Sequence, residues 1–109
     1  MADSVETMAA TAVVETPRAS GYLQQLCKHF AHKAPKSFDA SEGRVAFAMG
    51  ECLLRASPDG GVLTMTASAA TNADLEHVQE IVGGHLERFA FREQLHVTWS
   101  AVRLQRNTG

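Results

Sequence analysis

Two segments of the chain repeat apolar residues with helical spacing, and in each segment those residues occupy only one face. In residues 17–33 the apolar face carries Leu23, Leu26 and Phe30. A helix with one apolar stripe buries that stripe against a single neighbour and leaves its other face in water. Each helix is therefore expected to cover one side of a sheet.

Local signals mark the ends of these helices. Thr16 followed by Pro17 starts the first helix, because the threonine oxygen accepts from free amides and the fixed φ of proline suits the first turn. Pro35 ends it. Thr71, with Asp74 three residues later, resembles a capping box and starts the second helix. The apolar stripe of the second helix is predicted to be Leu75, Val78, Ile81, Val82, Leu86 and Phe89.

Five other segments have the composition and alternation of strands. They are residues 11–15, 45–49, 52–56, 62–67 and 95–102. Residues 57–61, Ser-Pro-Asp-Gly-Gly, have the composition of a tight turn, in which a glycine supplies the positive φ. Residues 45–67 are therefore predicted to form a three-stranded meander.

The predicted order of elements is β-α-β-β-β-α-β. Two one-faced helices on a mostly antiparallel sheet define an α+β fold, a two-layer sandwich with both helices on one face. The opposite face is then the wetter one and carries Leu53 and Arg55. A single domain is expected over residues 11–103, between flexible tails at residues 1–10 and 104–109.

Charge and composition exclude several classes of function. The formal net charge is −2 at pH 7, so no overall positive field draws the chain onto nucleic acid or anionic lipid. No apolar run approaches transmembrane length, and the first nine residues lack the features of a secretory signal. Cys27 and Cys52 lie in apolar patterns typical of buried free thiols. We therefore predict a cytoplasmic protein that binds neither nucleic acid nor membrane.

Two histidines are candidate ligand-binding residues. His85 falls near the centre of the second helix's apolar stripe, so we expect it to be mostly buried and hydrogen-bonded. His29 lies at the edge of the first helix's buried face. The two imidazoles either converge as acid, base or metal ligand, or His85 is a core residue bonded to a carbonyl or carboxylate. The tetrahedral ligand set is unfilled, so neither a metal nor a cofactor is predicted.

Four charged residues lie near the C-terminal end of the second helix, namely Glu87, Arg88, Arg92 and Glu93. In one interpretation the arginines stabilise the helix end, where the macrodipole favours cations, and pair with the glutamates. In the other, Arg88 and Arg92 clamp a carboxylate or phosphate of a ligand or partner. Both arginines are therefore candidate binding residues.

No complete catalytic motif accompanies these residues. The sequence contains no phosphate-binding loop, no paired CxxC, no HExxH helix and no nucleophile-elbow sequence. Gly83 and Gly84 lie inside the second helix, where they are expected to permit the close approach of a neighbouring element. No catalytic residue is predicted.

Three blocks of the sequence are informative together: residues 20–33, residues 43–47 with 50–52, and residues 85–93 with 97–99. In this order they resemble a small bacterial family catalogued as domain of unknown function 2218 (DUF2218). The resemblance spans roughly residues 11–99 and implies no activity for individual residues. Relatives occur alone and fused to flavin-dependent siderophore-interacting reductases, so the resemblance implies a link to bacterial iron handling.

Two functional hypotheses follow. The first is a non-catalytic binding or accessory module whose partner is a siderophore-interacting reductase or a small anionic ligand. The second is a small enzyme or metal-binding protein that uses His85 with His29. The two differ in whether these histidines meet in the folded chain.

Overall fold

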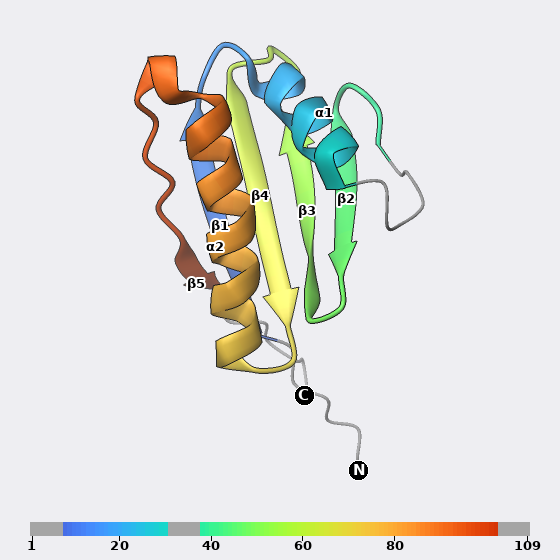
Figure 1. Cartoon of the computed structure of the whole chain (residues 1–109). Helices are drawn as coiled ribbons and strands as arrows, with labels where there is room; N and C mark the ends of the chain where they lie inside the picture. The colour runs from blue at the N-terminus through green and yellow to red at the C-terminus, as the bar shows by residue number, and fades with distance from the viewer. Residues whose placement is uncertain (1–7, 31–37, 103–109) are drawn as a thin grey trace, which may run out of the picture.

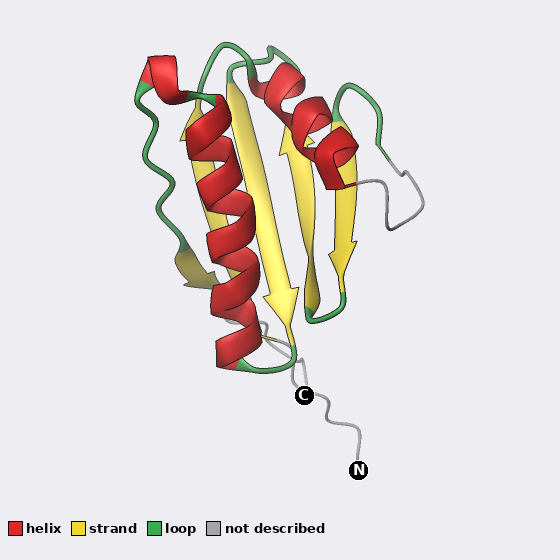
Figure 2. Ribbon diagram, viewed as in Figure 1, coloured by secondary structure: helices red, strands yellow, loops and turns green. Residues whose placement is uncertain are grey.

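The computed structural model describes residues 8–30 and 38–102, which form a sheet with both helices on one side (Figures 1 and 2). The elements are β1 (Met8–Glu15), α1 (Ala19–Phe30), β2 (Glu42–Phe47), β3 (Gly50–Ala56), β4 (Val62–Ala69), α2 (Asn72–Phe89), the 3-10 helix η2 (Phe91–Glu93) and β5 (Ser100–Val102). The strands are antiparallel in the order β2-β3-β4-β1-β5. The predicted α+β fold and its element order are confirmed.

One face of the sheet is buried because successive strand residues point to opposite sides. The register places Ala12 opposite Met65 and Met65 opposite Leu54, so all three side chains share a face. None of them is more than 2% exposed. Leu26 of α1 and Leu86 of α2 are fully buried in the same cluster. The core therefore lies between this face and the two helices.

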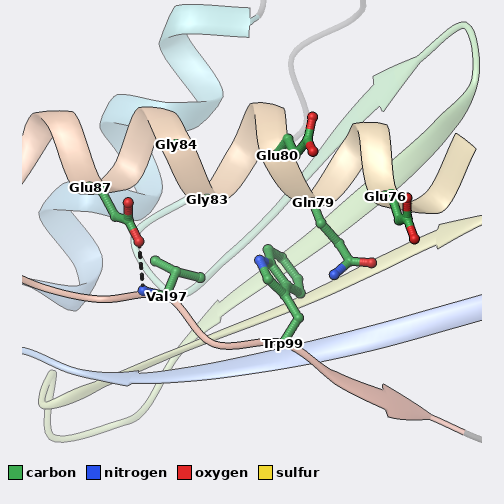
Figure 3. Close-up of a pocket in the computed structure, with 8 residues that line it drawn as sticks. All are labelled: Glu76, Gln79, Glu80, Gly83, Gly84, Glu87, Val97 and Trp99. Atoms are coloured by element: carbon green, nitrogen blue, oxygen red, sulfur yellow. Dashed lines mark hydrogen bonds between the residues drawn. The ribbon is translucent and has the colours of Figure 1, made fainter. Parts of the chain in front are cut away.

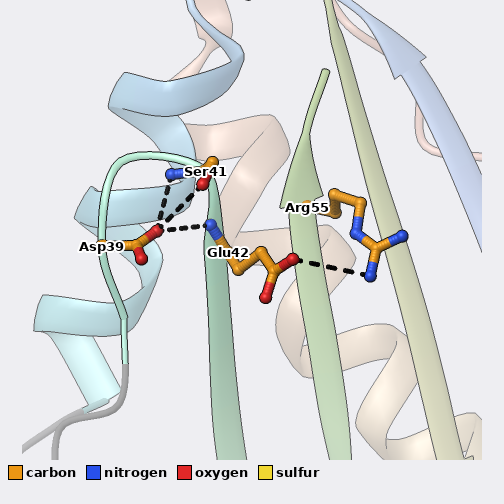
Figure 4. Close-up of polar contacts among 4 residues, drawn as sticks. All are labelled: Asp39, Ser41, Glu42 and Arg55. Carbon is orange, nitrogen blue, oxygen red and sulfur yellow. Dashed lines mark hydrogen bonds and ion pairs between the residues drawn. The ribbon is translucent and has the colours of Figure 1, made fainter. Parts of the chain in front are cut away.

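The other face of the sheet is open among the described residues. Leu53 is 46% exposed there. Two ion pairs join β2 to β3 on this face. Arg44 pairs with Glu51 at 2.6 Å, and Arg55 pairs with Glu42 at 3.6 Å (Figure 4). The predicted wetter face with Leu53 and Arg55 is confirmed.

The start of β2 is held by a turn around Asp39 (Figure 4). Its carboxylate accepts from the backbone N–H groups of Ser41 and Glu42 at 2.8 and 2.9 Å. These bonds hold the pKa of Asp39 below its ordinary value. The hydroxyl of Ser20 in α1 donates to the carbonyl of Ala40 at 2.6 Å, which ties the same turn to the helix layer.

Both helix starts agree with the local signals. The Thr71 hydroxyl oxygen accepts from the backbone N–H of Asp74 at 3.1 Å and caps α2. The Thr16 oxygen likewise accepts from an amide just before α1. The part of the predicted first helix beyond Phe30 lies outside the described residues. No described helix is both long and apolar enough to cross a membrane.

The first strand is longer than predicted. It begins at Met8 instead of residue 11, and Ala9 and Ala10 are buried. Alanine has little strand propensity, so these positions carry no local strand signal. Pairing with β4 on one side and β5 on the other keeps them extended. The predicted tail at residues 1–10 is therefore wrong for residues 8–10, whereas residues 1–7 and the predicted tail at residues 104–109 lie outside the described residues.

The last strand is shorter than predicted, because β5 covers only Ser100–Val102 and not residues 95–102. η2 follows α2, and Gln94 then adopts a left-handed backbone with φ 54°. The backbone N–H of Val97 donates to the Glu87 carboxylate at 2.9 Å. Residues 95–99 thus lie against α2. The backbone N–H of Val97 donates to a side chain of this helix and not to a neighbouring strand.

Close packing at Gly50 generates a test of the fold. A β-carbon there would collide with the backbone carbonyl of Ser68 and would lie 3.1 Å from a methyl of Val78 in α2. Gly50→Ala should therefore lower the free energy of unfolding by about 1–3 kcal/mol, because the backbone yields little. Urea denaturation midpoints measure this change.

The matched control for Gly50 is Gly21 in α1, where an added β-carbon meets nothing within 4 Å. Gly21→Ala should raise the free energy of unfolding by up to about 1 kcal/mol, because alanine favours helix. A Gly50→Ala midpoint equal to that of the wild type would contradict the packing described above.

Candidate functional site

The structure brings the two candidate histidines together. His29 lies in the last turn of α1 and His85 in the second half of α2, where the two helices approach each other on the same face of the sheet. Their ring centroids are 4.7 Å apart, with the ring planes inclined at 46°. Sequence spacing does not show this meeting, because 56 residues separate the two positions.

Phenylalanine rings surround the histidine pair. Phe30 contacts His85 with its centroid at 5.1 Å, and Phe89 lies 5.8 Å from His29, both edge-on. Phe47 of β2 packs edge-on against Phe30 at 5.2 Å. The imidazoles therefore sit in an aromatic cluster, defined as His29, Phe30, Phe47, His85 and Phe89.

The hydrogen bonding of His85 selects its tautomer. Its Nδ1 lies 2.7 Å from the carbonyl oxygen of Ile81. Because a carbonyl only accepts, Nδ1 carries the proton and Nε2 keeps a lone pair when the ring is neutral. The predicted bond between His85 and a backbone carbonyl is present.

His85 is mostly but not fully buried, in line with the expectation, and His29 is exposed. The expected place of His85 near the centre of the apolar stripe is wrong. Val82 and Leu86 form the centre of the stripe that faces the sheet, and both are at most 1% exposed. His85 lies at the flank of this stripe and faces α1, so it is not sealed against the sheet.

Glu93, predicted as part of an exposed charge cluster, is a structural acceptor. The Thr16 hydroxyl donates to its Oε1 at 2.8 Å and the Tyr22 hydroxyl to its Oε2 at 2.5 Å. The two bonds, that of Tyr22 first, hold the pKa of Glu93 below its ordinary value. Burial, followed by the bond to Glu93, raises the pKa of Tyr22. This carboxylate ties the end of β1, α1 and η2 together.

Arg88 and Arg92 are exposed at the end of α2 and in η2. Their expected partners are engaged elsewhere, Glu87 by the amide of Val97 and Glu93 as described above. The Arg92 guanidinium lies over the ring of Phe91, 5.5 Å from its centroid. Phe91 is 65% exposed. We call Arg88, Phe91 and Arg92 the arginine edge.

A groove that the sequence did not reveal runs between α2 and residues 95–99 (Figure 3). Its volume is about 370 Å³, and Trp99 and Val97 line it opposite the helix. A β-carbon at Gly83 would lie 3.1 Å from Nε1 of Trp99. The close approach predicted at this glycine is therefore confirmed. The recurrence of Glu at positions 76, 80 and 87 was the sequence signal available for the groove.

The two thiols are structural. Cys27 and Cys52 are free and buried, as predicted. Burial is the main cause that raises the pKa of Cys52 to about 12, so this thiol stays protonated near neutral pH. Within residues 8–30 and 38–102, no group of three or more His, Cys, Asp or Glu residues is arranged to hold a metal ion.

Comparisons with known proteins cover most of the chain. A family model described as "Uncharacterized protein conserved in bacteria (DUF2218)" matches residues 11–100. The NMR structure of PA4090 from Pseudomonas aeruginosa is 30% identical, with a TM-score of 0.72. The match covers 85% of this chain and 95% of that one. No curated protein matches the chain. Neither the family description nor that of the solved structure names an activity.

The Glu93 network makes stability depend on pH. Tyr22→Phe should lower the free energy of unfolding by about 1 kcal/mol at neutral pH, because it removes a hydrogen bond to a carboxylate. The folded-state pKa of Glu93 lies below the ordinary value of 4.5 for a glutamate side chain. The contribution of these hydrogen bonds to the free energy of unfolding is thus complete above pH 4.5, and it is lost as the pH falls through the lower pKa of the folded state. Urea midpoints across this range measure the loss.

The control for Tyr22 is a double-mutant cycle with Glu93→Gln. In the Glu93→Gln background, Tyr22→Phe should cost less than in the wild type, because the charged acceptor is already gone. A cost of Tyr22→Phe that is the same at neutral and acidic pH would contradict the assigned role of the Glu93 carboxylate.

Proposed function

The chain belongs to the bacterial family DUF2218, and we propose that it is a non-catalytic binding module that docks an acidic partner through its arginine edge. The observation that carries this proposal is an exposed Phe91 ring with the Arg92 guanidinium over it, and Arg88 is exposed in the preceding turn of α2. Arginine and aromatic residues are enriched at interfaces and among their energetic hot spots.

The local charge of the arginine edge supports this choice of partner. The Glu87 carboxylate accepts a hydrogen bond from the backbone N–H of Val97. The Glu93 carboxylate accepts from the hydroxyls of Thr16 and Tyr22. Guanidinium groups bind carboxylates and phosphates in a two-pronged geometry. The edge is therefore positive on a chain whose formal net charge is −2.

The proposed partner is a siderophore-interacting reductase, the partner implied by the family resemblance, and it is bound in the cytoplasm. Buried free thiols at Cys27 and Cys52 support that location. A small anionic ligand, such as a ferric siderophore, is the other occupant for the same guanidinium groups. The absence of a complete catalytic motif supports a non-catalytic role.

Charge reversal tests the arginine edge. Arg92→Glu and Arg88→Glu should each weaken binding to the reductase about fivefold, the scale of one exposed charge pair, and more at low salt. Stability should change by less than about 0.5 kcal/mol, because both side chains are exposed. Isothermal titration calorimetry with the reductase and, separately, with a ferric siderophore measures the affinities.

Arg55→Glu is the matched control, since Arg55 is an exposed arginine on the open face of the sheet. It should leave the affinity for the reductase unchanged. Equal weakening by Arg55→Glu and Arg92→Glu would point to a nonspecific charge effect and contradict docking at the arginine edge.

The histidine pair supports a second candidate function, metal binding. The two rings lie 4.7 Å apart, and Nδ1 of His85 is bonded to the Ile81 carbonyl. A backbone carbonyl on one nitrogen is the usual arrangement around a histidine that binds metal through the other. The pair supplies two of the four ligands of a tetrahedral site, and solvent or a partner completes it.

Zinc titration tests this second candidate. Zinc should raise the melting temperature of the wild type, because a ligand that binds only the folded state stabilises it. His29→Ala and His85→Ala should abolish this rise. His77→Ala, at an exposed position of α2, should retain it. Equal shifts in all four proteins would show that the histidine pair only packs.

A further inference from the structure

We propose that the groove between α2 and residues 95–99 binds a linear aliphatic polyamine. The proposal is independent of the arginine edge, because none of the residues that line the groove belongs to that edge. The groove volume of about 370 Å³ lies in the range of small-molecule sites. Its lining combines an indole ring with several carboxylates (Figure 3).

The carboxylates are arranged in a line. Glu76, Glu80 and Glu87 all line the groove, and spacings of four and seven residues place them on one face of α2. At 1.5 Å per residue, the two intervals span about 6 Å and about 10 Å along the helix. A flexible chain with several ammonium groups matches this row better than a ligand with a single positive charge.

The charge on this row is uncompensated within the described part of the chain. Glu76 and Glu80 are exposed and lie four positions apart, so their charges repel each other. The ion pairs between described residues involve Arg44 and Arg55, which belong to the sheet. Glu87 uses one oxygen, Oε2, for the amide of Val97. A polycation would relieve this repulsion.

The floor of the groove suits methylene groups. Trp99 and Val97 are partly buried and face Gly83. Gly84 also lines the groove, and neither glycine presents a side chain. Open space surrounds Gly84, where an added β-carbon would meet nothing within 4 Å. An alkyl chain would therefore lie on apolar surface, and an ammonium group near the indole gains a cation–π attraction.

These features separate a polyamine from other ligands of the groove. A compact ion such as Mg²⁺ requires octahedral oxygen ligands and keeps most of its water, so it gains nothing from Trp99. An anionic ligand is repelled by the three glutamates. An uncharged apolar ligand leaves Glu76 and Glu80 unpaired.

Trp99 is the single tryptophan of the chain, so intrinsic fluorescence reports on the groove directly. Titration of the full chain with spermidine should change this fluorescence saturably with one ligand per chain. Glu80→Gln should weaken binding about two- to fivefold, the scale of one exposed charge pair. Gly84→Leu should abolish binding, because the new side chain fills the groove without meeting other atoms at its β-carbon.

Two matched controls keep the test specific. Glu15→Gln removes an exposed carboxylate from β1, and Gly21→Leu adds the same side chain at an open position of α1. Both should bind spermidine as the wild type does, and so should Arg92→Glu, because that residue belongs to the other proposed surface. Circular dichroism checks that Gly84→Leu is folded.

The proposal is overturned by any of three results. Spermidine produces no saturable fluorescence change, Mg²⁺ at matched ionic strength reproduces the change, or the controls weaken binding as much as Glu80→Gln. The last two results would show general attraction of counterions. None of the three bears on docking at the arginine edge, so the two proposals fail separately.

Discussion

The pairing of β1 with β4 over eight residues is the constraint on which the rest of the structure depends. It places the first strand inside the sheet and aligns Ala12 with Met65, so that both point to the same side. Because alternation makes this side continuously apolar and leaves charged and polar residues on the other, α1 and α2 both pack here. Two helices on one face then bring His29 within reach of His85 and leave another side of α2 facing residues 95–99.

Small residues and one carboxylate set how closely these layers approach. Gly50 lets β3, β4 and α2 meet, and Gly83 lets Trp99 reach the backbone of α2. Glu93 joins the end of β1, α1 and η2 through Thr16 and Tyr22, which are at most 6% exposed. The hydrogen bond from Thr16 to Glu93 joins residues 77 positions apart in the sequence, so it fixes η2 against the end of β1.

The glutamates of α2 and η2 lie in different surroundings, and this gives the second helix and its end two surfaces of opposite charge. Glu87 and Glu93 accept hydrogen bonds from other parts of the chain, which leaves Arg88 and Arg92 without those neighbours. Toward the start of the helix, Glu76 lies on the groove. This order also complements the macrodipole, which favours anions near the N-terminus and cations near the C-terminus. The small net charge of the chain therefore conceals two separate candidate binding surfaces.

Sequence alone determined the features that depend on neighbouring residues or on a repeating pattern. These are the element order, the one-faced helices, the cap at Thr71 and the turn in which Gly60 has φ 77°. Only the tertiary structure decided the length of β1, the packing of residues 95–99 against α2, the contact between His29 and His85 and the groove beside Trp99. Each of these features requires segments distant in sequence to compete for the same backbone groups or the same space, and local propensity does not encode the outcome of that competition.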